Sequence, residues 1–290
     1  EILLSHPAIR GVSFVGSTEV AKHIYATAAS HGKRVQALGE AKNHALVLND
    51  APIVQTAAAV MNSAFGCAGE RCMALPVLVV QEEIAEPLLA ELKRQIQGKK
   101  VGAAYDKETD LGPVVTAKHK AFILDKIEKG LEEGATIALD GREVKVDGYA
   151  DGFYIGHTIL DHVTTDMAVG EEEIFGPVLS IKRVKDFEEG LAVMNANPFA
   201  NGSVIFTQSG YYAREFAKRT DGGMVGINVG IPVPVGIFPF SGHKNSFFGD
   251  LHAHGKDAIR FYTESKTVTA RWFSEEETAH VDSWDGSRTN

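Results

Sequence analysis

The side chain best suited to chemistry in this sequence is the thiol of Cys72. It lies in the run 65–74, FGCAGERCMA, directly after Arg71 and behind Gly66 and Gly69. A neighbouring cation lowers the pKa of a thiol, and the thiolate is the form that attacks electrophilic carbon. We therefore predict that Cys72 is a nucleophile. The run by itself leaves open that Cys72 is a buried structural cysteine.

A glycine-serine turn near the start of the chain predicts an anion site. Residues 11–16, GVSFVG, favour a strand, and Ser17 or Thr18 would cap a helix that runs to about Ser30. Residues 33–39 return as a strand, which gives a βαβ unit with parallel strands. Backbone N–H groups at the start of such a helix attract anions, although many turns of this kind bind nothing.

The elements that must position these residues alternate between strand and helix as far as about residue 229, which predicts an α/β fold with a parallel sheet. Asp50 is expected to cap a helix that carries Pro52 in its first turn and ends near Phe65, so that Cys72 lies on the connection behind it. The patterns predict further strands at 45–48, 75–80, 158–163, 178–184, 203–207 and 224–229, and helices at 84–97, 118–133, 187–195 and 211–219.

The C-terminal region carries two runs with period-two alternation, RFYT at 260–263 and TVTARW at 267–272. Both are typical of strand, and no further element follows them. A terminal strand of this kind completes the sheet of another subunit or stays a local edge strand, and the sequence leaves both open. Residues 274–290 are polar and are interpreted as a tail.

Composition excludes several classes of function. The chain has 290 residues, of which 44% are hydrophobic and 23% are charged, as in ordinary globular proteins. Its formal charge of −9 argues against a nucleic-acid surface. The two cysteines cannot form a disulfide framework and favour a reducing compartment. No apolar run is long enough to span a membrane, and the eleven histidines show no metal-ligand spacing.

Four short runs together resemble the aldehyde dehydrogenase family in type, order and spacing. They are FVGST at 14–18, GERC at 69–72, EEIFGPV at 172–178 and NPF at 197–199. Further runs are similar to the CoA-acylating methylmalonate/malonate semialdehyde dehydrogenase branch. They are AKNH at 41–44, GERCMA at 69–74, GINV at 226–229 with IPVP at 231–234, and KNS at 244–246 with FGDLH at 248–252.

The resemblance covers residues from about 6 to 273 and implies a domain organisation. Residues 1–39 correspond to the last βαβ unit of a Rossmann-like NAD-binding domain, most of which lies before this point in family members. Residues 40–255 correspond to the catalytic domain, and residues 256–273 to an oligomerisation strand. The absence of an initiator Met at Glu1 fits a chain that is entered midway.

The resemblance also implies roles for individual residues. Cys72 would attack the aldehyde, lose hydride to NAD and become a thioester, with its backbone N–H as one oxyanion donor. Gly16 and Ser17 would contact the NAD pyrophosphate, Glu173 the ribose beside the nicotinamide, and Phe175 the nicotinamide itself. Taken alone, the same residues would be interpreted as an N-cap serine, a surface carboxylate and a core phenylalanine.

The residue that would activate water in hydrolytic family members has no counterpart here. Depending on the register, its position falls on Ala37 or Leu38, and neither side chain can accept a proton. Glu40 lies two or three residues further on, where the branch carries glycine, and is a poor alternative base. The thioester would therefore persist until the thiol of coenzyme A arrives. Glutamate would strain the turn if position 40 had a positive φ.

Arg71 would bind a substrate carboxylate through a charge-assisted contact, as the resemblance implies. Alternatively, Arg71 would only lower the pKa of Cys72 or pair with Glu70. Cys67 is interpreted as a small core or loop residue.

The expected function is thus NAD-dependent oxidation of malonate or methylmalonate semialdehyde, with decarboxylation and transfer to coenzyme A as in valine or inositol catabolism. A homodimer or homotetramer is expected, in the cytoplasm or, in a eukaryote, the mitochondrial matrix. The alternatives are a hydrolytic NAD(P)-dependent enzyme and a catalytically incomplete chain that acts only in folding or assembly.

Overall fold

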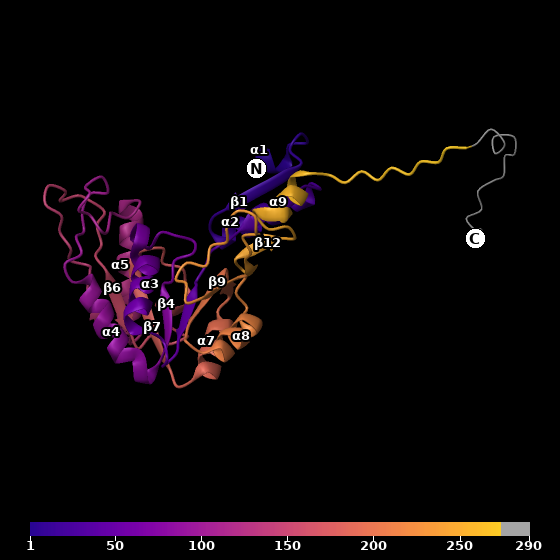
Figure 1. Ribbon diagram of the computed structural model, residues 1–290. Coiled ribbons are helices and arrows are strands. Elements are labelled where there is room, and N and C mark those ends of the chain that lie inside the picture. Colours follow the sequence, from indigo (N-terminus) through magenta and orange to yellow (C-terminus); the bar gives the residue numbers. More distant parts are fainter. Residues whose placement is uncertain (274–290) are drawn as a thin grey trace.

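The computed structural model describes residues 1–273 and divides them between a large seven-stranded body and a smaller three-stranded unit (Figure 1). The chain passes once from the small unit into the body, directly after residue 38, and returns near residue 247. The predicted tail at 274–290 lies outside the described residues. No helix within residues 1–273 is long and apolar enough to cross a membrane.

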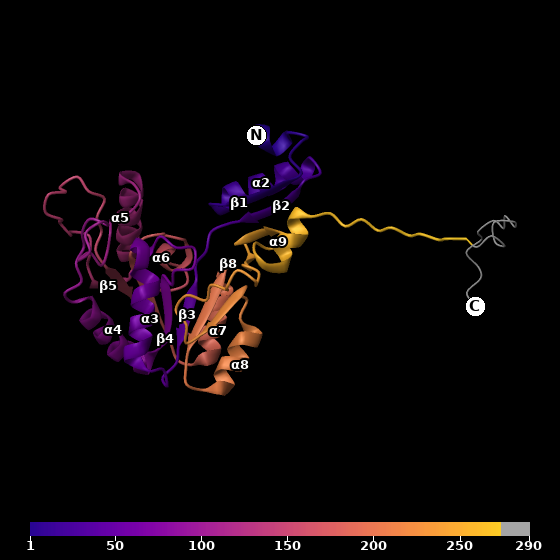
Figure 2. The same cartoon turned by 45° about the horizontal axis from the view of Figure 1, so that its top comes forward.

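The small unit confirms the βαβ prediction. Strand β1 (Gly11–Val15) and strand β2 (Arg34–Leu38) are parallel and are joined by helix α2 (Thr18–Ser30). Strand β12 (Phe247–Gly249) adds to the free edge of β2 in the antiparallel sense. The N-terminal unit therefore includes residues from far along the chain, and Figure 2 shows these segments side by side.

Helix α9 (Gly255–Tyr262) corrects the strand predicted at 260–263. Phe261 is buried beside Gly11 of β1, while Tyr262 and Ile259 are exposed. The Arg34 guanidinium fixes the end of this helix by donating to the carbonyls of Phe261 (2.7 Å) and Thr263 (2.6 Å). The period-two pattern was therefore misleading, because one buried aromatic and one set of backbone acceptors suffice to hold a short terminal helix.

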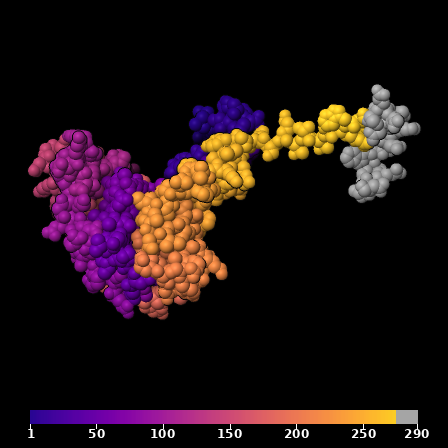
Figure 3. Space-filling view, viewed as in Figure 1, coloured from indigo at the N-terminus to yellow at the C-terminus, as the bar shows by residue number. Residues whose placement is uncertain are grey.

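Beyond α9 the described chain forms no regular element. Residues 267–272 make no ladder with any strand of residues 1–273, so the second predicted strand is not formed within the described part of the chain. In Figure 3 the indigo N-terminal and yellow C-terminal segments pack together, and the last yellow residues leave the molecule as a single extended segment. Its role in oligomerisation stays a prediction.

The body is a mixed, mostly parallel sheet in the order β10-β9-β3-β4-β7-β6-β5. Only β5 is antiparallel to its neighbour. All six strands predicted from residue 45 onward are present, within three residues of the expected ends. These six are β3 (His44–Val47), β4 (Val77–Gln81), β6 (Thr158–Asp161), β7 (Val178–Val184), β9 (Gly202–Phe206) and β10 (Met224–Ile227). The seventh strand, β5 (Thr136–Leu139), was not predicted.

Helices cover both faces of this sheet, as Figure 1 shows. One face carries α3 (Ile53–Phe65) and α4 (Glu82–Ile96), and the other carries α7 (Phe187–Ala196) and α8 (Gly210–Arg219). The remaining elements are α1 (Ile2–Ser5), the turn η1 (Gly66–Gly69), α5 (Ala117–Glu132), α6 (Ala168–Glu171), and the paired short strands β8 (Phe199–Ala200) and β11 (His243–Lys244).

The alternating side chains of β3 show why this strand is apolar throughout. Ala45 and Val47 pack into the core under α3 and α4, whereas Leu46 and Leu48 pack into the core under α7 and α8. Full burial of one such leucine contributes about 1.5–3 kcal/mol. Two-sided burial thus fixes the register of this strand.

Asp50 does not cap α3, which corrects a further prediction. Pro52 is the N-cap residue, and the Asp50 carboxylate accepts hydrogen bonds from the Thr207 hydroxyl (2.8 Å) and the backbone N–H of Gln208 (3.0 Å). A partner more than 150 residues away in the sequence outcompetes the local N–H groups. Asp50 therefore joins the end of β3 to the end of β9.

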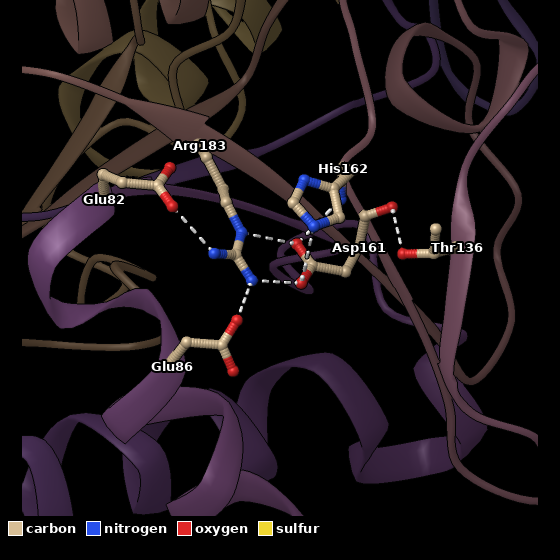
Figure 4. A network of polar contacts seen from close by, with 6 residues as sticks. All are labelled: Glu82, Glu86, Thr136, Asp161, His162 and Arg183. Atoms are coloured by element: carbon tan, nitrogen blue, oxygen red, sulfur yellow. Dashed lines mark hydrogen bonds and ion pairs between the residues drawn. The ribbon is translucent and has the colours of Figure 1, made fainter.

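A partly buried arginine joins the sheet to α4 (Figure 4). Arg183 of β7 donates from Nε and Nη2 to the two oxygens of Asp161 on β6 (3.2 and 2.6 Å), and also contacts Glu82 and Glu86 of α4. Burial alone would raise the pKa of Asp161, but the bonds from Arg183 and the His162 N–H outweigh it and lower that pKa. The carboxylate is thus charged in the folded protein.

Candidate active site

The predicted nucleophile lies at the amino edge of the large sheet. The loops that lead into β3, β4, β7 and β9 carry Asn43, Cys72, Phe175 and Asn201, respectively. Because these four strands are parallel and adjacent, their amino ends meet along one edge. Ligands of open α/β sheets commonly bind at the opposite edge, so sequence rules alone would have placed this site at the wrong end of the strands.

The loop before Cys72 has an unusual backbone. Cys67, Ala68 and Gly69 are consecutive residues with positive φ (52°, 54° and 72°). Such a conformation costs roughly 1–2 kcal/mol for a residue other than glycine. A Cβ on Gly69 would lie 2.1 Å from the carbonyl oxygen of Gly176, so the glycine allows two backbones to touch. The cysteine loop is thereby pressed against the loop that carries Phe175.

Two asparagines, neither of which had a predicted role, hold the backbone of Cys72. The amide of Asn43 donates to the carbonyls of Cys72 (2.9 Å) and Ala74 (2.8 Å). The amide of Asn201 also donates to the Cys72 carbonyl, at 3.0 Å. Both side chains are buried. Their signal in the sequence was a polar residue directly before an apolar strand, which is too common to identify a site.

The thiol of Cys72 is solvent-accessible, which excludes the buried structural cysteine as an alternative. Although the thiol is accessible, Cys72 is partly shielded from water, and this burial raises the pKa of the thiol above its ordinary value of 9.0. The negative charge of Glu173 adds to this effect, and the backbone N–H groups of Cys72 and Met73 oppose it. The expectation that Arg71 lowers this pKa is wrong, because the pKa is raised and Arg71 is not among the groups that shift it.

Arg71 instead contacts the end of helix α3. Its Nε donates to the sulfur of Cys67 (3.2 Å) and its Nη1 donates to the carbonyl of Asn62 (3.0 Å). The alternative pairing with Glu70 is also wrong, since Glu70 accepts from the N–H of Val115. Arg71 and Cys72 nevertheless line one cavity, together with Ala41, Asn43, Ala64, Gly69, Ala74, Pro76, Glu173, Phe175 and Gly176.

Glu173 enters this cavity from the loop before β7. One of its carboxylate oxygens accepts from the N–H of Ala41 at 3.1 Å. Burial raises the pKa of Glu173 to about 7, with a further rise from Glu40 and opposition from the Ala41 bond and Lys42. The interpretation of Glu173 as a free surface carboxylate is therefore wrong. Among the described residues lining the cavity, it is the one carboxylate.

Phe175 lines the same cavity and is only partly buried, unlike a core phenylalanine. Its backbone has a positive φ of 54°. The imidazole of His119, on α5, contacts the Phe175 carbonyl at 2.7 Å and so holds the loop in this conformation. A bulky residue with positive φ in the cavity that also holds an accessible thiol is strained local structure of the kind that gathers at functional sites.

Gly16 and Ser17 lie outside this cavity, at the start of α2. Ser17 is the N-cap residue, but its side chain makes no capping hydrogen bond and is exposed. Gly16 donates its N–H to the carbonyl of Leu38 (3.1 Å), which joins the turn to the end of β2. An exposed hydroxyl at the start of a 13-residue helix fits a phosphate-bearing ligand.

Glu40 connects the helix start to the cavity. Its carboxylate accepts from the N–H of Thr18 (3.3 Å), and its own N–H donates to the Thr18 hydroxyl (3.0 Å). Its φ is not positive, so the strain considered for this position does not arise. A carboxylate engaged at the start of α2 is turned toward the helix, where an anion would bind. Ala37 and Leu38, at the alternative base positions, are both buried.

Lys42 and His44 are buried beside a second, small cavity behind β3. Burial and the nearby Lys182 lower the pKa of Lys42 to about 7, and Lys42 Nζ makes no hydrogen bond within residues 1–273. Burial also lowers the pKa of His44 to about 3, so the ring is neutral and its Nδ1–H donates to the Lys42 carbonyl (2.7 Å). These residues do not reach the Cys72 cavity.

Comparison with known proteins decides the family. A sequence profile described as "Aldehyde dehydrogenase family" matches residues 1–268. The chain belongs to the aldehyde dehydrogenase family. The resemblance found in the four sequence runs and the α/β fold expected from it are both confirmed.

Relatives of this aldehyde dehydrogenase chain carry the name malonate-semialdehyde dehydrogenase. The protein from Oceanobacillus iheyensis is 50% identical over 270 residues, which are 93% of this chain and 55% of that protein. The protein from Bacillus subtilis strain 168 is 48% identical over 270 residues, with the same coverage. The chain thus spans about half the length of the curated relatives it matches.

Solved structures give the same picture. The methylmalonate-semialdehyde dehydrogenase of Oceanimonas doudoroffii superposes with a TM-score of 0.92 at 46% identity, covering 94% of this chain and 56% of that one. A Sinorhizobium meliloti protein assigned as a methylmalonate-semialdehyde dehydrogenase, solved with NAD, gives the same TM-score, identity and coverage.

Proposed function

We propose that this aldehyde dehydrogenase chain carries the thiol and the carboxylate-recognition site of an NAD-dependent, CoA-acylating malonate or methylmalonate semialdehyde dehydrogenase. One observation carries the proposal: an accessible Cys72, Arg71 and Glu173 line a single cavity. The names of the relatives support the semialdehyde as substrate class.

The residues present fit NAD. Ser17 offers a free hydroxyl at the start of α2, and residues 40–41 join this helix start to Glu173 in the cavity. Glu173 would hold ribose hydroxyls, Phe175 would pack on the nicotinamide, and Gly16 and Ser17 would hold the pyrophosphate. When bound, NAD would supply the hydride acceptor.

Cys72 would form and break the covalent bond to the substrate. Its thiol must first lose a proton, which its raised pKa opposes in the free protein. The thiolate would then add to the aldehyde carbon, and the backbone N–H of Cys72 would stabilise the resulting oxyanion. Loss of hydride from that carbon leaves a thioester on Cys72. The asparagine bonds to the Cys72 carbonyl keep this backbone fixed during the addition.

The fate of the thioester follows from the side chains around it. Ala37 and Leu38 carry no base, and the Glu40 carboxylate is engaged with the Thr18 N–H. A general base must lie within hydrogen-bond reach of the water it activates, so Glu40 does not fit hydrolysis in this arrangement. The thiol of coenzyme A would instead displace Cys72 and carry away the acyl group.

Arg71 would contact the carboxylate of the semialdehyde. A carboxylate β to the acyl carbonyl is lost as CO2 once the thioester forms, because the thioester stabilises the enolate that remains. The products would be acetyl-CoA or propionyl-CoA, NADH, and CO2 or bicarbonate. The guanidinium therefore selects substrates that can undergo this loss.

The test is an absorbance assay for NADH with malonate semialdehyde, NAD and CoA, with Cys72→Ala as the blank. NADH formation that stops after about one equivalent without CoA, and continues when CoA is added, supports the proposal. Steady NADH formation without CoA, with free acid as product, would show a hydrolytic enzyme. No NADH from a folded sample would leave the catalytically incomplete chain as the correct alternative.

We also propose that the chain assembles as a homodimer or homotetramer in the cytoplasm. The extended segment after α9 exposes Val268, Trp272 and Phe273, at 77%, 85% and 56% of their full surface. Exposed apolar side chains on an extended segment that joins no sheet within residues 1–273 favour addition to a second copy. Light scattering after gel filtration tests this, and a monomer at micromolar concentration would contradict it.

A further inference from the structure

The guanidinium of Arg71 lies in a cradle at the C-terminal end of α3. Gly66 is the C-cap residue of this helix, and the carbonyl of Asn62 belongs to its last turn. That carbonyl accepts from Arg71 Nη1 at 3.0 Å, while the sulfur of Cys67 accepts from Arg71 Nε at 3.2 Å. The end of a helix carries partial negative charge, which favours a cation there.

The absent side chain of Gly66 makes room for the guanidinium. A Cβ on Gly66 would lie 2.5 Å from Arg71 Nη1, 2.8 Å from Cζ and 2.9 Å from Nη2. These are the three nearest atoms to that position, so the space is occupied by Arg71. Gly66 has φ −57° and ψ 139°, a conformation that any residue adopts. Its small size, and not its backbone freedom, is therefore what this site uses.

Cys67 has a use that its sequence context did not indicate. It is exposed rather than part of the core, and its sulfur accepts the Nε–H of Arg71. With Nε and Nη1 both engaged, the guanidinium plane is fixed. Nη2 has no hydrogen bond within residues 1–273, and Arg71 lines the Cys72 cavity. The cradle thus leaves the Nη2 donors without a protein acceptor among residues 1–273, on a side chain that lines the cavity.

We infer that Gly66 and Cys67 are positioning residues for Arg71, and that this cradle determines the preference of the Cys72 site for electrophiles that carry a carboxylate. The inference rests on the proposed function, because it takes Arg71 to be the carboxylate contact. It adds the residues that place Arg71, and it predicts that enlarging position 66 or removing the acceptor at position 67 weakens carboxylate recognition without changing the thiol.

The test uses two alkylating reagents of similar size that differ in charge. Iodoacetate carries a carboxylate and iodoacetamide is neutral, and in both the Cys72 thiolate displaces iodide. Trypsin cleaves after Arg71, so mass spectrometry follows Cys67 and Cys72 in separate peptides. The measured quantity is the iodoacetate-to-iodoacetamide rate ratio at Cys72, divided by the same ratio for glutathione. This measurement needs neither NAD nor CoA.

For the unmodified chain we expect a normalised ratio of about threefold or more, as for a partly exposed charge pair. Gly66→Ala and Cys67→Ala should bring it close to one, with the iodoacetamide rate unchanged. Cys67→Ser should restore the preference, because a hydroxyl also accepts from Nε. Gly236→Ala is the matched control, since a Cβ there meets no atom within 4 Å.

The outcomes separate the two proposals. A ratio of one in the unmodified chain would refute Arg71 as a carboxylate contact and with it this part of the proposed function. A preference that persists in Gly66→Ala and Cys67→Ala would refute the cradle alone. If circular dichroism shows that Gly66→Ala does not fold, the comparison of Cys67→Ala with Cys67→Ser tests the cradle instead. Alanine, serine and cysteine adopt a φ of 52° at similar cost, so this comparison does not change the backbone strain.

Discussion

Replacing Lys42 by Met should stabilise the protein at neutral pH. Lys42 is 2% exposed, and its Nζ makes no hydrogen bond in the described part of the chain. The positive charge of the nearby Lys182 repels a charged Lys42. The Nζ of Lys182 lies 3.1 Å from a carboxylate oxygen of Glu171. A methionine of similar length fills the same space and needs no partner.

The size of the effect follows from the pKa of Lys42, which burial lowers from 10.5 to about 7. A lysine with a lowered pKa contributes stability above pH 10.5 that is lost as pH falls toward 7, because the unfolded chain binds the proton more tightly. One pKa unit corresponds to about 1.4 kcal/mol, so the cost in the native protein reaches about 4 kcal/mol at pH 7 and falls to about 1 kcal/mol at pH 9.5.

Urea unfolding followed by far-UV circular dichroism measures this difference. We expect Lys42→Met to raise the free energy of unfolding by about 2–4 kcal/mol at pH 7, and the gain to shrink toward pH 9.5. Lys33→Met is the matched control, since that buried ammonium donates to the carbonyls of His6 and Ile9 (2.6 Å each) and its loss should destabilise. A destabilised Lys42→Met, or a gain independent of pH, would refute the reasoning.

Three further predictions concern other charges. Glu40→Gln should tighten NAD binding about two- to fivefold, as measured by calorimetry, because it removes a negative charge from the start of α2. Unchanged affinity would show that the carboxylate moves aside at no cost. Glu173→Gln should shift the pH profile of Cys72 alkylation by iodoacetamide to lower pH, since the Glu173 charge raises the pKa of the thiol; an unmoved profile would contradict this. Arg183→Met should lower the free energy of unfolding by about 3 kcal/mol at pH 7, and this loss should become smaller as acid protonates Asp161. Equal losses at pH 7 and pH 3.5 would argue against a buried charge pair.

The sequence determined the elements of the large sheet well, because their signals are local. Period and length predict strands such as β7 and helices such as α4, and punctuating residues mark their ends. The short runs around Cys72 and Glu173 were sufficient to predict the family and the candidate site residues. At Asp50 and at 260–263 the local signal was overruled, because the deciding partners, Thr207 and Arg34, are remote in the chain.

Only the tertiary structure decided how the site is built. Parallel neighbours bring Asn43 and Asn201 to one carbonyl, although 158 residues separate them, and no local pattern encodes that meeting. The orientation of Arg71 likewise depends on a missing Cβ at Gly66 and a sulfur at Cys67. A sequence gives the side chains that are present, whereas their pKa values and their selectivity for ligands depend on what surrounds them. Burial raises the pKa of Cys72 against expectation, and burial is a property of the whole fold.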